Sequence, residues 1–377
     1  MSTVVIEGIC DPKFQAVADI FQRNFDMGAD VGASFCVTIE GEIVVDLWGG
    51  FADEARTRPW QKDTIVNVYS TTKTMTALTA LMLADRGLID FDAPVAKYWP
   101  EFAAAGKGGI KVGHLMSHSA GLSGWKEKIV VEDLYDWDKV CALLAAQTPY
   151  WMPGTASGYH AFTQGNLVGE VVRRVTGKSL GSVFRDEIAQ PLRADFHIGL
   201  PISEHHRVAD LIPPSTPSPI DQMVSELTYN MSTNPPINPL DTYTRSWREA
   251  EIPAAGGHGN ARSIAQVHSI LANGGVANGK RFMSERGCRE ALKEQVNSLD
   301  IITGMPTRLG VGFMLPRGAL RAKNPNSLMG GGHGGSVAII DMDARTTFGY
   351  AMNMMVMGTT IGHARSWDLI DAIWAAQ

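Results

Sequence analysis

A serine and a lysine three residues apart could form a nucleophile and its base. Ser70 is followed by Thr-Thr-Lys73. Residues i and i+3 lie on one face of a helix, and a serine hydroxyl attacks a carbonyl only when a neighbouring group takes its proton. A lysine can take that proton only while it is neutral, a state that burial favours. We therefore expect Ser70 to be the nucleophile and Lys73 to share the proton transfer with a second group.

Two other serines stand in patterns that could be confused with a nucleophile. Ser123 also has a lysine three residues on, but it lies in a turn-like segment with no helix behind it. Ser179 lies in a Gly-x-Ser-x-Gly pattern, which forms a nucleophile elbow only between a strand and a helix. Residues 169–176 have helical periodicity, so Ser179 is expected to cap the next helix. Ser70 is preferred because a β-rich run becomes an apolar helix there, and a helix N-terminus favours a developing anion.

A tyrosine and a glycine-rich run could complete the site. Tyr159 follows a Pro-Gly turn and opens a predicted helix, so its phenol could protonate a leaving group; a buried structural tyrosine is the alternative. Residues 330–336 read Gly-Gly-Gly-His-Gly-Gly-Ser before a strand-like run. Glycines let the backbone approach a substrate, and an N–H from this run could complete an oxyanion hole with that of Ser70. His333 could bind substrate or orient Tyr159; a flexible turn is the alternative.

Periodicity and turn residues predict the elements that position these side chains. Helices are expected over 11–27, from Thr71 to Gly87, and over 157–176, 180–192, 261–274 and 364–376; strands are expected over 33–50 (a hairpin), 64–70, 310–316, 336–341 and 346–354. Strands at both ends and helices between them predict one sheet assembled from the two termini. We expect a discontinuous sheet domain (1–62 and 255–377), an inserted helical domain (63–254) and an active site at the seam.

A segment rich in Pro, Ser, Thr and Asn spans residues 211–240. Its length without periodicity is typical of an ordered loop over a site, and a surface excursion is the alternative. Aromatic residues in and beside this segment and elsewhere in the helical region suggest an apolar pocket suited to acyl or aryl groups. The candidates are Trp125, Tyr150, Trp151, Tyr229, Tyr243 and Trp247.

Composition excludes several classes of protein. The chain has 377 residues, 45% of them hydrophobic, and a net charge of −6 without a basic run, so nucleic acid is not an expected partner. The N-terminal residues argue against a secretory signal, and a transmembrane helix is not expected because no apolar stretch is long enough to span a membrane. Four scattered cysteines are expected to be reduced thiols, and no His, Cys or acidic cluster, His205-His206 included, has zinc-ligand spacing. A cytoplasmic protein without metal or cofactor is expected.

Several motifs in order along the chain resemble the serine β-lactamase/penicillin-binding-protein superfamily. These are Val68-Tyr-Ser-Thr-Thr-Lys73, Leu83-Ala-Asp-Arg-Gly-Leu-Ile-Asp-Phe-Asp, His114-Leu-Met-Ser-His-Ser-Ala-Gly-Leu122, Tyr159-His-Ala and Gly256-Gly-His-Gly-Asn-Ala-Arg262. The match is most similar to the class C-like branch and its family VIII carboxylesterases. The resemblance implies an α+β fold, an antiparallel sheet flanked by helices with an inserted helical domain. It also implies that Ser70, Lys73 and Tyr159 are catalytic.

Two departures from the family pattern bear on the substrate. Ala161 stands where β-lactamases of this branch have the Asn of Tyr-x-Asn, and their Lys-Thr-Gly motif has no lysine here. In one register His333-Gly334-Gly335 replaces that motif and Ser336 supplies the second oxyanion N–H. In the other register Gly330-Gly331-Gly332 replaces it and His333 supplies the N–H. Because the missing cation typically binds a β-lactam carboxylate, a small carboxylic ester is the expected substrate. A β-lactamase, a D-amino-acid peptidase or amidase, an acyltransferase and a non-catalytic binding module remain alternatives.

Overall fold

A six-stranded antiparallel sheet joins the two ends of the chain. In the computed structural model, which describes residues 4–214, 225–318, 320, 322–356 and 361–377, the strand order is β1-β3-β2-β14-β13-β12. The N-terminal strand β2 pairs with the C-terminal strand β14 from Ala33 opposite Met352 to Ile39 opposite Thr346. This confirms the sheet expected from the sequence. The strands are β1 (Ile6–Cys10), β2 (Gly32–Ile39), β3 (Glu42–Gly50), β12 (Ser327–Gly331), β13 (Val337–Asp341) and β14 (Thr346–Met352).

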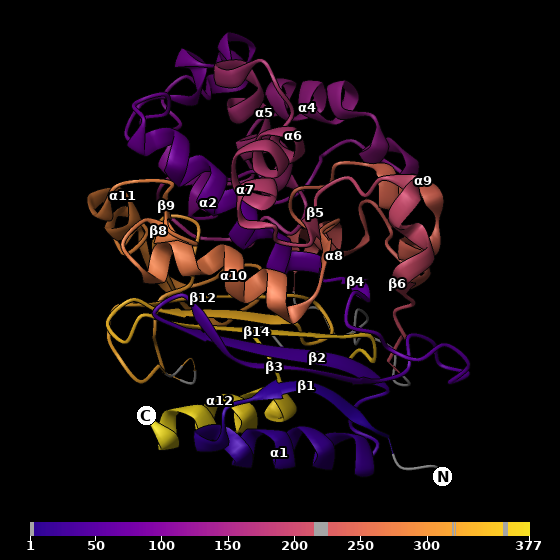
Figure 1. The fold of residues 1–377 in the computed structure, drawn as a ribbon. Coiled ribbons are helices and arrows are strands. Elements are labelled where there is room, and N and C mark those ends of the chain that lie inside the picture. Colours follow the sequence, from indigo (N-terminus) through magenta and orange to yellow (C-terminus); the bar gives the residue numbers. More distant parts are fainter. Residues whose placement is uncertain (1–3, 215–224, 319, 321, 357–360) are drawn as a thin grey trace.

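Helices cover both faces of this sheet. Helices α1 (Gln15–Asp26) and α12 (Ala364–Ala376) lie on one face, and α10 (Ala261–Ala272) lies on the other (Figure 1). Strands β13 and β14 are buried along their whole length. A strand covered on both faces carries apolar residues at consecutive positions rather than alternating ones, which is the pattern of Val337-Ala-Ile-Ile.

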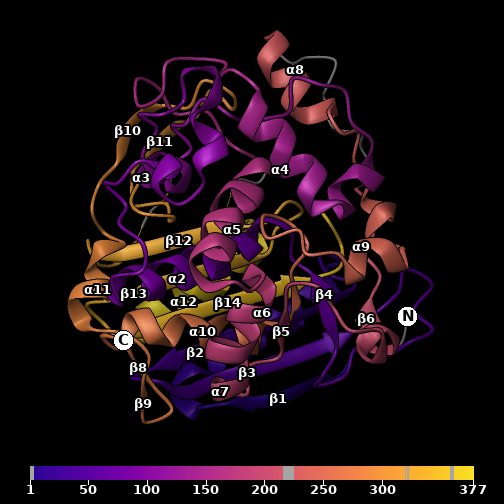
Figure 2. The ribbon, with the colours of Figure 1, turned by 90° about the horizontal axis from the view of Figure 1, so that it is seen from above.

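A helical region lies over the α10 face of the sheet, with α2 and α5 near its centre (Figure 2). Helix α2 is buried at every residue from Thr72 to Leu83, so it is apolar all round rather than amphipathic. It ends before Gly87, which has a positive φ of 76°. The helices here and nearby are α2 (Thr72–Asp85), α3 (Val112–Met116), α4 (Trp137–Ala146), α5 (Thr163–Thr176), α6 (Leu180–Phe184), α7 (Gln190–Leu192), α8 (Glu226–Thr233), α9 (Arg245–Glu249) and α11 (Glu285–Glu290).

A small second sheet leads the chain to the start of α2. Its order is β5-β7-β4-β6, and β4 pairs with β7 through Asn67 opposite His258. Two further hairpins pair β8 with β9 and β10 with β11. These short strands are β4 (Ile65–Asn67), β5 (Phe196–His197), β6 (Val208–Ala209), β7 (His258–Gly259), β8 (Val276–Ala277), β9 (Lys280–Arg281), β10 (Val296–Leu299) and β11 (Pro306–Leu309).

Several expected elements differ from the structure. Residues 310–316 form no strand; Gly312, with a φ of 82°, turns the chain there, and only Met314 bridges to a neighbouring strand. The helix expected from Ser157 begins at Thr163. Strand β12 was not expected from the sequence. Its residues read Ser-Leu-Met-Gly-Gly, and the two glycines interrupt the apolar run that would indicate a strand.

The Pro-rich stretch 211–240 also differs from the expected loop. It contains α8, whose N-cap Ser225 accepts a hydrogen bond from the Thr228 N–H. Residues 215–224 of the stretch lie outside the described residues. Across the described ranges, no helix combines the length and apolar character needed to cross a membrane.

Candidate active site

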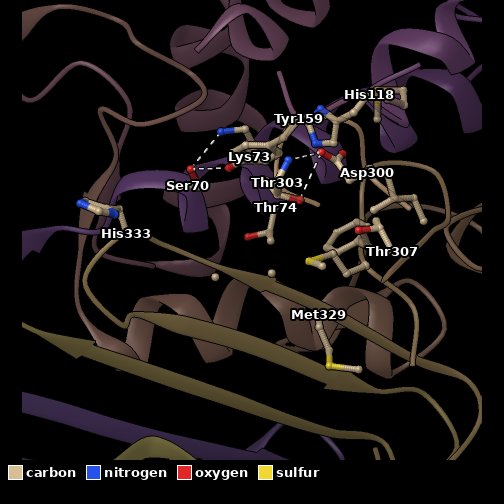
Figure 3. Close-up of a pocket in the computed structure, with 17 residues that line it drawn as sticks. Ser70, Lys73, Thr74, His118, Tyr159, Asp300, Thr303, Thr307, Met329 and His333 are labelled. Atoms are coloured by element: carbon tan, nitrogen blue, oxygen red, sulfur yellow. Dashed lines mark hydrogen bonds between the residues drawn. The ribbon is translucent and has the colours of Figure 1, made fainter. Parts of the chain in front are cut away.

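Ser70 lies in the tight turn between β4 and α2. Its Oγ is 3.0 Å from the Nζ of Lys73 and 2.7 Å from the phenol oxygen of Tyr159 (Figure 3). The preceding Tyr69 has a φ of 41°, an unusual value for a residue with a side chain, and its N–H donates to the Asn67 side chain. Backbone strain of this kind persists only where surrounding contacts impose it and is concentrated at functional sites. The geometry therefore brings together the three residues expected to be catalytic.

Lys73 is buried and is held by oxygen atoms that carry no formal charge. Its Nζ donates to the backbone carbonyls of Ala161 at 2.6 Å and Ala254 at 2.9 Å, as well as to Ser70 Oγ. Among the described residues it has no carboxylate partner within ion-pair distance. Burial without a counter-ion disfavours the ammonium and lowers the pKa of Lys73 to about 7. A large share of Lys73 is therefore neutral at neutral pH and able to accept a proton.

Tyr159 is the second proton-transfer group that contacts Ser70. Its phenol donates to Ser70 Oγ, and its ring packs edge-on against the imidazole of His118 at a centroid distance of 5.0 Å. Burial raises the pKa of Tyr159 to about 12, and the negative charge of Asp300 acts in the same direction. The phenol is therefore protonated when the site is at rest. It can relay a proton between Ser70 and a leaving group.

The glycine-rich run 330–336 passes beside Ser70, and only its first half lines the cavity there. Gly330, Gly331 and His333 line the cavity at Ser70, whereas Gly334, Gly335 and Ser336 do not. Ser336 Oγ instead donates to the Val68 carbonyl at 2.9 Å, and the Gly332 N–H donates to the Ser336 carbonyl. Ser336 thus closes the turn against the segment that carries Ser70, which favours the register in which His333 supplies the second oxyanion N–H.

The side chain of His333 does not contact Tyr159. Its ring packs edge-on against Tyr69 at a centroid distance of 5.5 Å, on the other side of Ser70 from Tyr159 (Figure 3). The expectation that His333 orients Tyr159 is therefore wrong. Its position on the cavity wall leaves a role in binding substrate open.

A cavity of about 190 Å³ opens from Ser70 between α2, β12 and the β10–β11 hairpin region. Sequence reasoning missed most of its wall, because the residues come from segments far apart in the chain and share no motif. Beyond the three catalytic candidates and the glycine run, the wall consists of Thr74, Met116, His118, Asp300, Thr303, Thr307, Leu309, Gly312, Phe313, Met314 and Met329. His118, which belongs to the His114–Leu122 motif, accepts a hydrogen bond at Nδ1 from the His160 N–H.

The three tryptophans expected in the pocket do not line it. Trp125 is buried and donates to the Val140 carbonyl, and Trp151 donates to the Ala156 carbonyl. Trp247 is buried and its ring packs against that of Tyr69, the residue before Ser70, so it stabilises the turn that carries Ser70. Nor do any of the described residues of the Pro-rich stretch line the cavity. Trp125 and Trp247 lie in the core, where burial of their large apolar area stabilises the fold.

The competing serines have structural roles or no role in the site. Ser179 caps α6 by accepting from the Ser182 N–H, and helix α5 precedes it, so the expectation of a helix cap is confirmed. Ser123 is buried away from the cavity, with no helix after it. The described residues contain no group of three His, Cys, Asp or Glu side chains able to hold a metal ion, and all four cysteines are free.

Comparisons with known proteins agree on one family. A model of the family described as Beta-lactamase matches residues 17–369. The chain is 35% identical over 366 residues to the Esterase/beta-lactamase LipL of Mycobacterium tuberculosis, covering 93% of this chain and 83% of that protein. A crystal structure of a family VIII carboxylesterase is 48% identical with a TM-score of 0.94, covering 99% of this chain and 100% of that one. A penicillin-binding protein homologue from Caulobacter crescentus is 38% identical with a TM-score of 0.92, over 99% and 100% of the two chains.

Proposed function

The chain belongs to the β-lactamase family and is a serine esterase with the fold of that family, and we propose that it cleaves small carboxylic esters through an acyl-enzyme on Ser70. The observation that carries this proposal is the pair of short contacts from Ser70 Oγ to Lys73 Nζ and to the Tyr159 phenol. Lys73 is largely neutral at rest and can act as a base, whereas Tyr159 is protonated and can act as an acid. The nucleophile therefore contacts both a base and an acid.

In the acylation step, neutral Lys73 takes the proton of Ser70 as Oγ attacks the ester carbonyl carbon. In this scheme the N–H groups of Ser70 and His333 hold the oxyanion, which is supported by the place of both residues on the wall of the same cavity. When the tetrahedral intermediate collapses, the bond to the alcohol oxygen breaks and Tyr159 donates its proton to that oxygen. Lys73 returns a proton to Tyr159, which restores the resting phenol and neutral lysine.

In the deacylation step, water attacks the acyl-enzyme from the cavity. The Tyr159–Lys73 pair accepts a proton from the water, and Ser70 Oγ leaves as its proton is returned. The products are the carboxylic acid and the free enzyme, so the sum of both steps is ester hydrolysis. An alcohol in place of water would give acyl transfer by the same steps.

The lining of the cavity supports esters over β-lactams. A β-lactam carries a carboxylate, and the described residues of the wall offer no cation other than Lys73, whose donors are already taken by Ser70 and two backbone carbonyls. No charged partner is therefore free to hold that carboxylate. The four free cysteines support, as part of this proposal, a reducing compartment such as the cytoplasm.

The test is turnover of p-nitrophenyl acetate, butyrate and octanoate beside nitrocefin, with the wild type and the Ser70→Ala variant. We expect ester hydrolysis that vanishes in the variant, and slow or absent nitrocefin cleavage. Normal kcat in Ser70→Ala would overturn the assignment of Ser70. Fast nitrocefin cleavage with little ester turnover would make the protein a β-lactamase.

A further inference from the structure

The cavity beside Ser70 has one apolar wall and one polar wall. Five apolar side chains form the first: Met116, Leu309, Phe313, Met314 and Met329. The second carries the side chains of Thr74, Asp300, Thr303 and Thr307, with Asp300 and Thr303 beyond Tyr159 as seen from Ser70 (Figure 3). A substrate group that enters the cavity must therefore satisfy four polar side chains as well as fill apolar space.

All three threonine hydroxyls on the polar wall donate their hydrogen to an acceptor within the protein. Thr74 Oγ1 donates to the Thr71 carbonyl at 2.7 Å, and Thr307 Oγ1 donates to the Met305 carbonyl at 3.1 Å. Thr303 Oγ1 donates to Asp300 Oδ1 at 3.2 Å. A hydroxyl whose single hydrogen is used offers only lone pairs to a ligand. The threonines can therefore accept hydrogen bonds from a substrate but do not donate them.

Asp300 adds a buried carboxylate to this wall, and it forms no ion pair with any of the described residues. Its Oδ1 caps a turn by accepting from the N–H groups of Ile302 at 3.0 Å and Thr303 at 2.9 Å. Among the residues that the structure describes, its Oδ2 has a single, longer contact, from Ser157 Oγ at 3.4 Å. One carboxylate oxygen is thus committed to the fold, while the other keeps most of its accepting capacity.

The remaining polar side chain on the wall, outside the catalytic group and His333, is that of His118. Its Nδ1 accepts from the His160 N–H, so a neutral His118 carries its proton on Nε2. Burial, together with the neighbouring His160 and Lys73, lowers the pKa of His118 well below its usual value, so the ring is neutral. His118 therefore adds one donor but no charge to balance Asp300.

We infer that this cavity selects esters in which a compact group carries a hydrogen-bond donor, a hydroxyl or an ammonium, and that Asp300 is the residue that determines this specificity. The inference rests on the proposed function, because it assumes an ester held at Ser70. A group without a donor leaves buried acceptors unpaired, which is how polar sites reject analogues that lack the matching group. A carboxylate is excluded by the charge of Asp300.

The size of the cavity limits the group that can enter. An apolar cavity of about 150 Å³ holds benzene, so one of about 190 Å³ accommodates a benzene ring with one small substituent. The group can belong to the acyl side or to the alcohol side of the ester, since both extend from the carbonyl at Ser70. The recognition chemistry is the same in either case.

The experiment compares rigid substrates that differ only at the para position. An acyl series consists of p-nitrophenyl benzoates bearing methyl, hydroxymethyl, aminomethyl or carboxylate groups, and an alcohol series consists of benzyl acetates with the same four groups. We compare kcat/KM in wild type and in Asp300→Asn, which keeps an Oδ1 able to cap the turn but removes the charge. The control is Asp341→Asn, because Asp341 caps a turn through the N–H groups of Asp343 and Ala344 and lies outside the cavity.

In at least one series, we expect wild type and Asp341→Asn to prefer the donor-bearing substrate over the methyl one by about tenfold or more, as a hydrogen bond to a charged group allows. Asp300→Asn should lose that preference and gain turnover of the carboxylate substrate. Wild type that hydrolyses the methyl substrates through Ser70 without any donor preference in either series would overturn the inference and leave the proposed function intact. So would an unchanged preference in Asp300→Asn. Turnover that survives Ser70→Ala would instead overturn the proposed function.

Discussion

The backbone carbonyl of Ala161 lies 2.6 Å from the Nζ of Lys73, so the position at which related β-lactamases carry an asparagine still binds the lysine through its main chain. The Ala161 and Ala254 carbonyls both accept hydrogen bonds from Lys73 Nζ, and neither acceptor carries a formal charge. A carboxylate in that place would stabilise the ammonium and raise the pKa. Neutral acceptors leave burial as the dominant effect, and the lysine is kept ready to act as a base.

The pH dependence of ester hydrolysis should follow Lys73. Only its neutral form accepts the Ser70 proton, so kcat/KM should fall about tenfold per pH unit below the apparent pKa of about 7 and level off above it. The measurement is kcat/KM for p-nitrophenyl butyrate between pH 5 and 9. A profile that is flat down to pH 5 would contradict the role of Lys73. Lys73→Arg, whose guanidinium stays charged, should be impaired at every pH in this range.

Replacing the Tyr159 phenol should slow the chemistry without emptying the site. Tyr159→Phe keeps the ring that packs against His118 but removes the hydroxyl that contacts Ser70 Oγ. We expect kcat to fall by about 10²–10⁴-fold, the usual contribution of a general acid–base group, with little change in KM. Tyr150→Phe is the control, because its phenol donates to the Trp125 carbonyl outside the cavity. Equal kcat values for the two variants would exclude Tyr159 from proton transfer.

The turn after β12 should tolerate no side chain at Gly332. A Cβ there would lie 2.0 Å from the Val68 carbonyl oxygen and 2.4 Å from Ser336 Oγ, so Gly332→Ala must push β12 away from the Ser70 turn. We expect esterase activity to be lost and the free energy of unfolding to fall by about 1–3 kcal/mol, as overpacking does. Gly109→Ala, where a Cβ would meet no atom within 4 Å, should change neither. Kinetics and urea unfolding measure both; full activity in Gly332→Ala would show that the turn can move.

A buried ion pair beneath the same turn should be costly to break. Arg365 of α12 donates to Asp30 at 2.9 Å and to the Gly334 carbonyl at 3.0 Å, and both charged side chains are almost completely buried. Arg365→Gln leaves Asp30 buried without its counter-ion, which typically costs about 3–5 kcal/mol of the free energy of unfolding. Arg23→Gln breaks the exposed pair with Asp368 and should cost less than about 1 kcal/mol. Similar urea midpoints for the two variants would refute the difference.

Local patterns in the sequence were enough to choose Ser70 as the candidate nucleophile, which the fold places against Lys73, and to predict much of the secondary structure. Ser70 and Lys73 are one helical turn apart, so their proximity follows from helix geometry. The apolar residues after Thr71 with Gly87 as a stop predict one helix, and the amphipathic pattern of 364–376 predicts another. The pairing of terminal strands into one sheet could also be predicted, because strands lie at both ends of the chain and helices lie between them. Each of these inferences depends on residues close together in sequence or on the order of elements.

Tertiary structure alone decided the walls of the cavity and the use of the glycine run. Asp300, Thr307 and Met329 reach the site from segments with no motif. Trp125 and Trp247, expected in the pocket as aromatic residues, lie in the core. Ser336 does not line the cavity, and its hydroxyl donates to the Val68 carbonyl, a contact between residues 268 positions apart. Contacts across such separations depend on how whole elements pack, and no spacing within a short window of sequence encodes them.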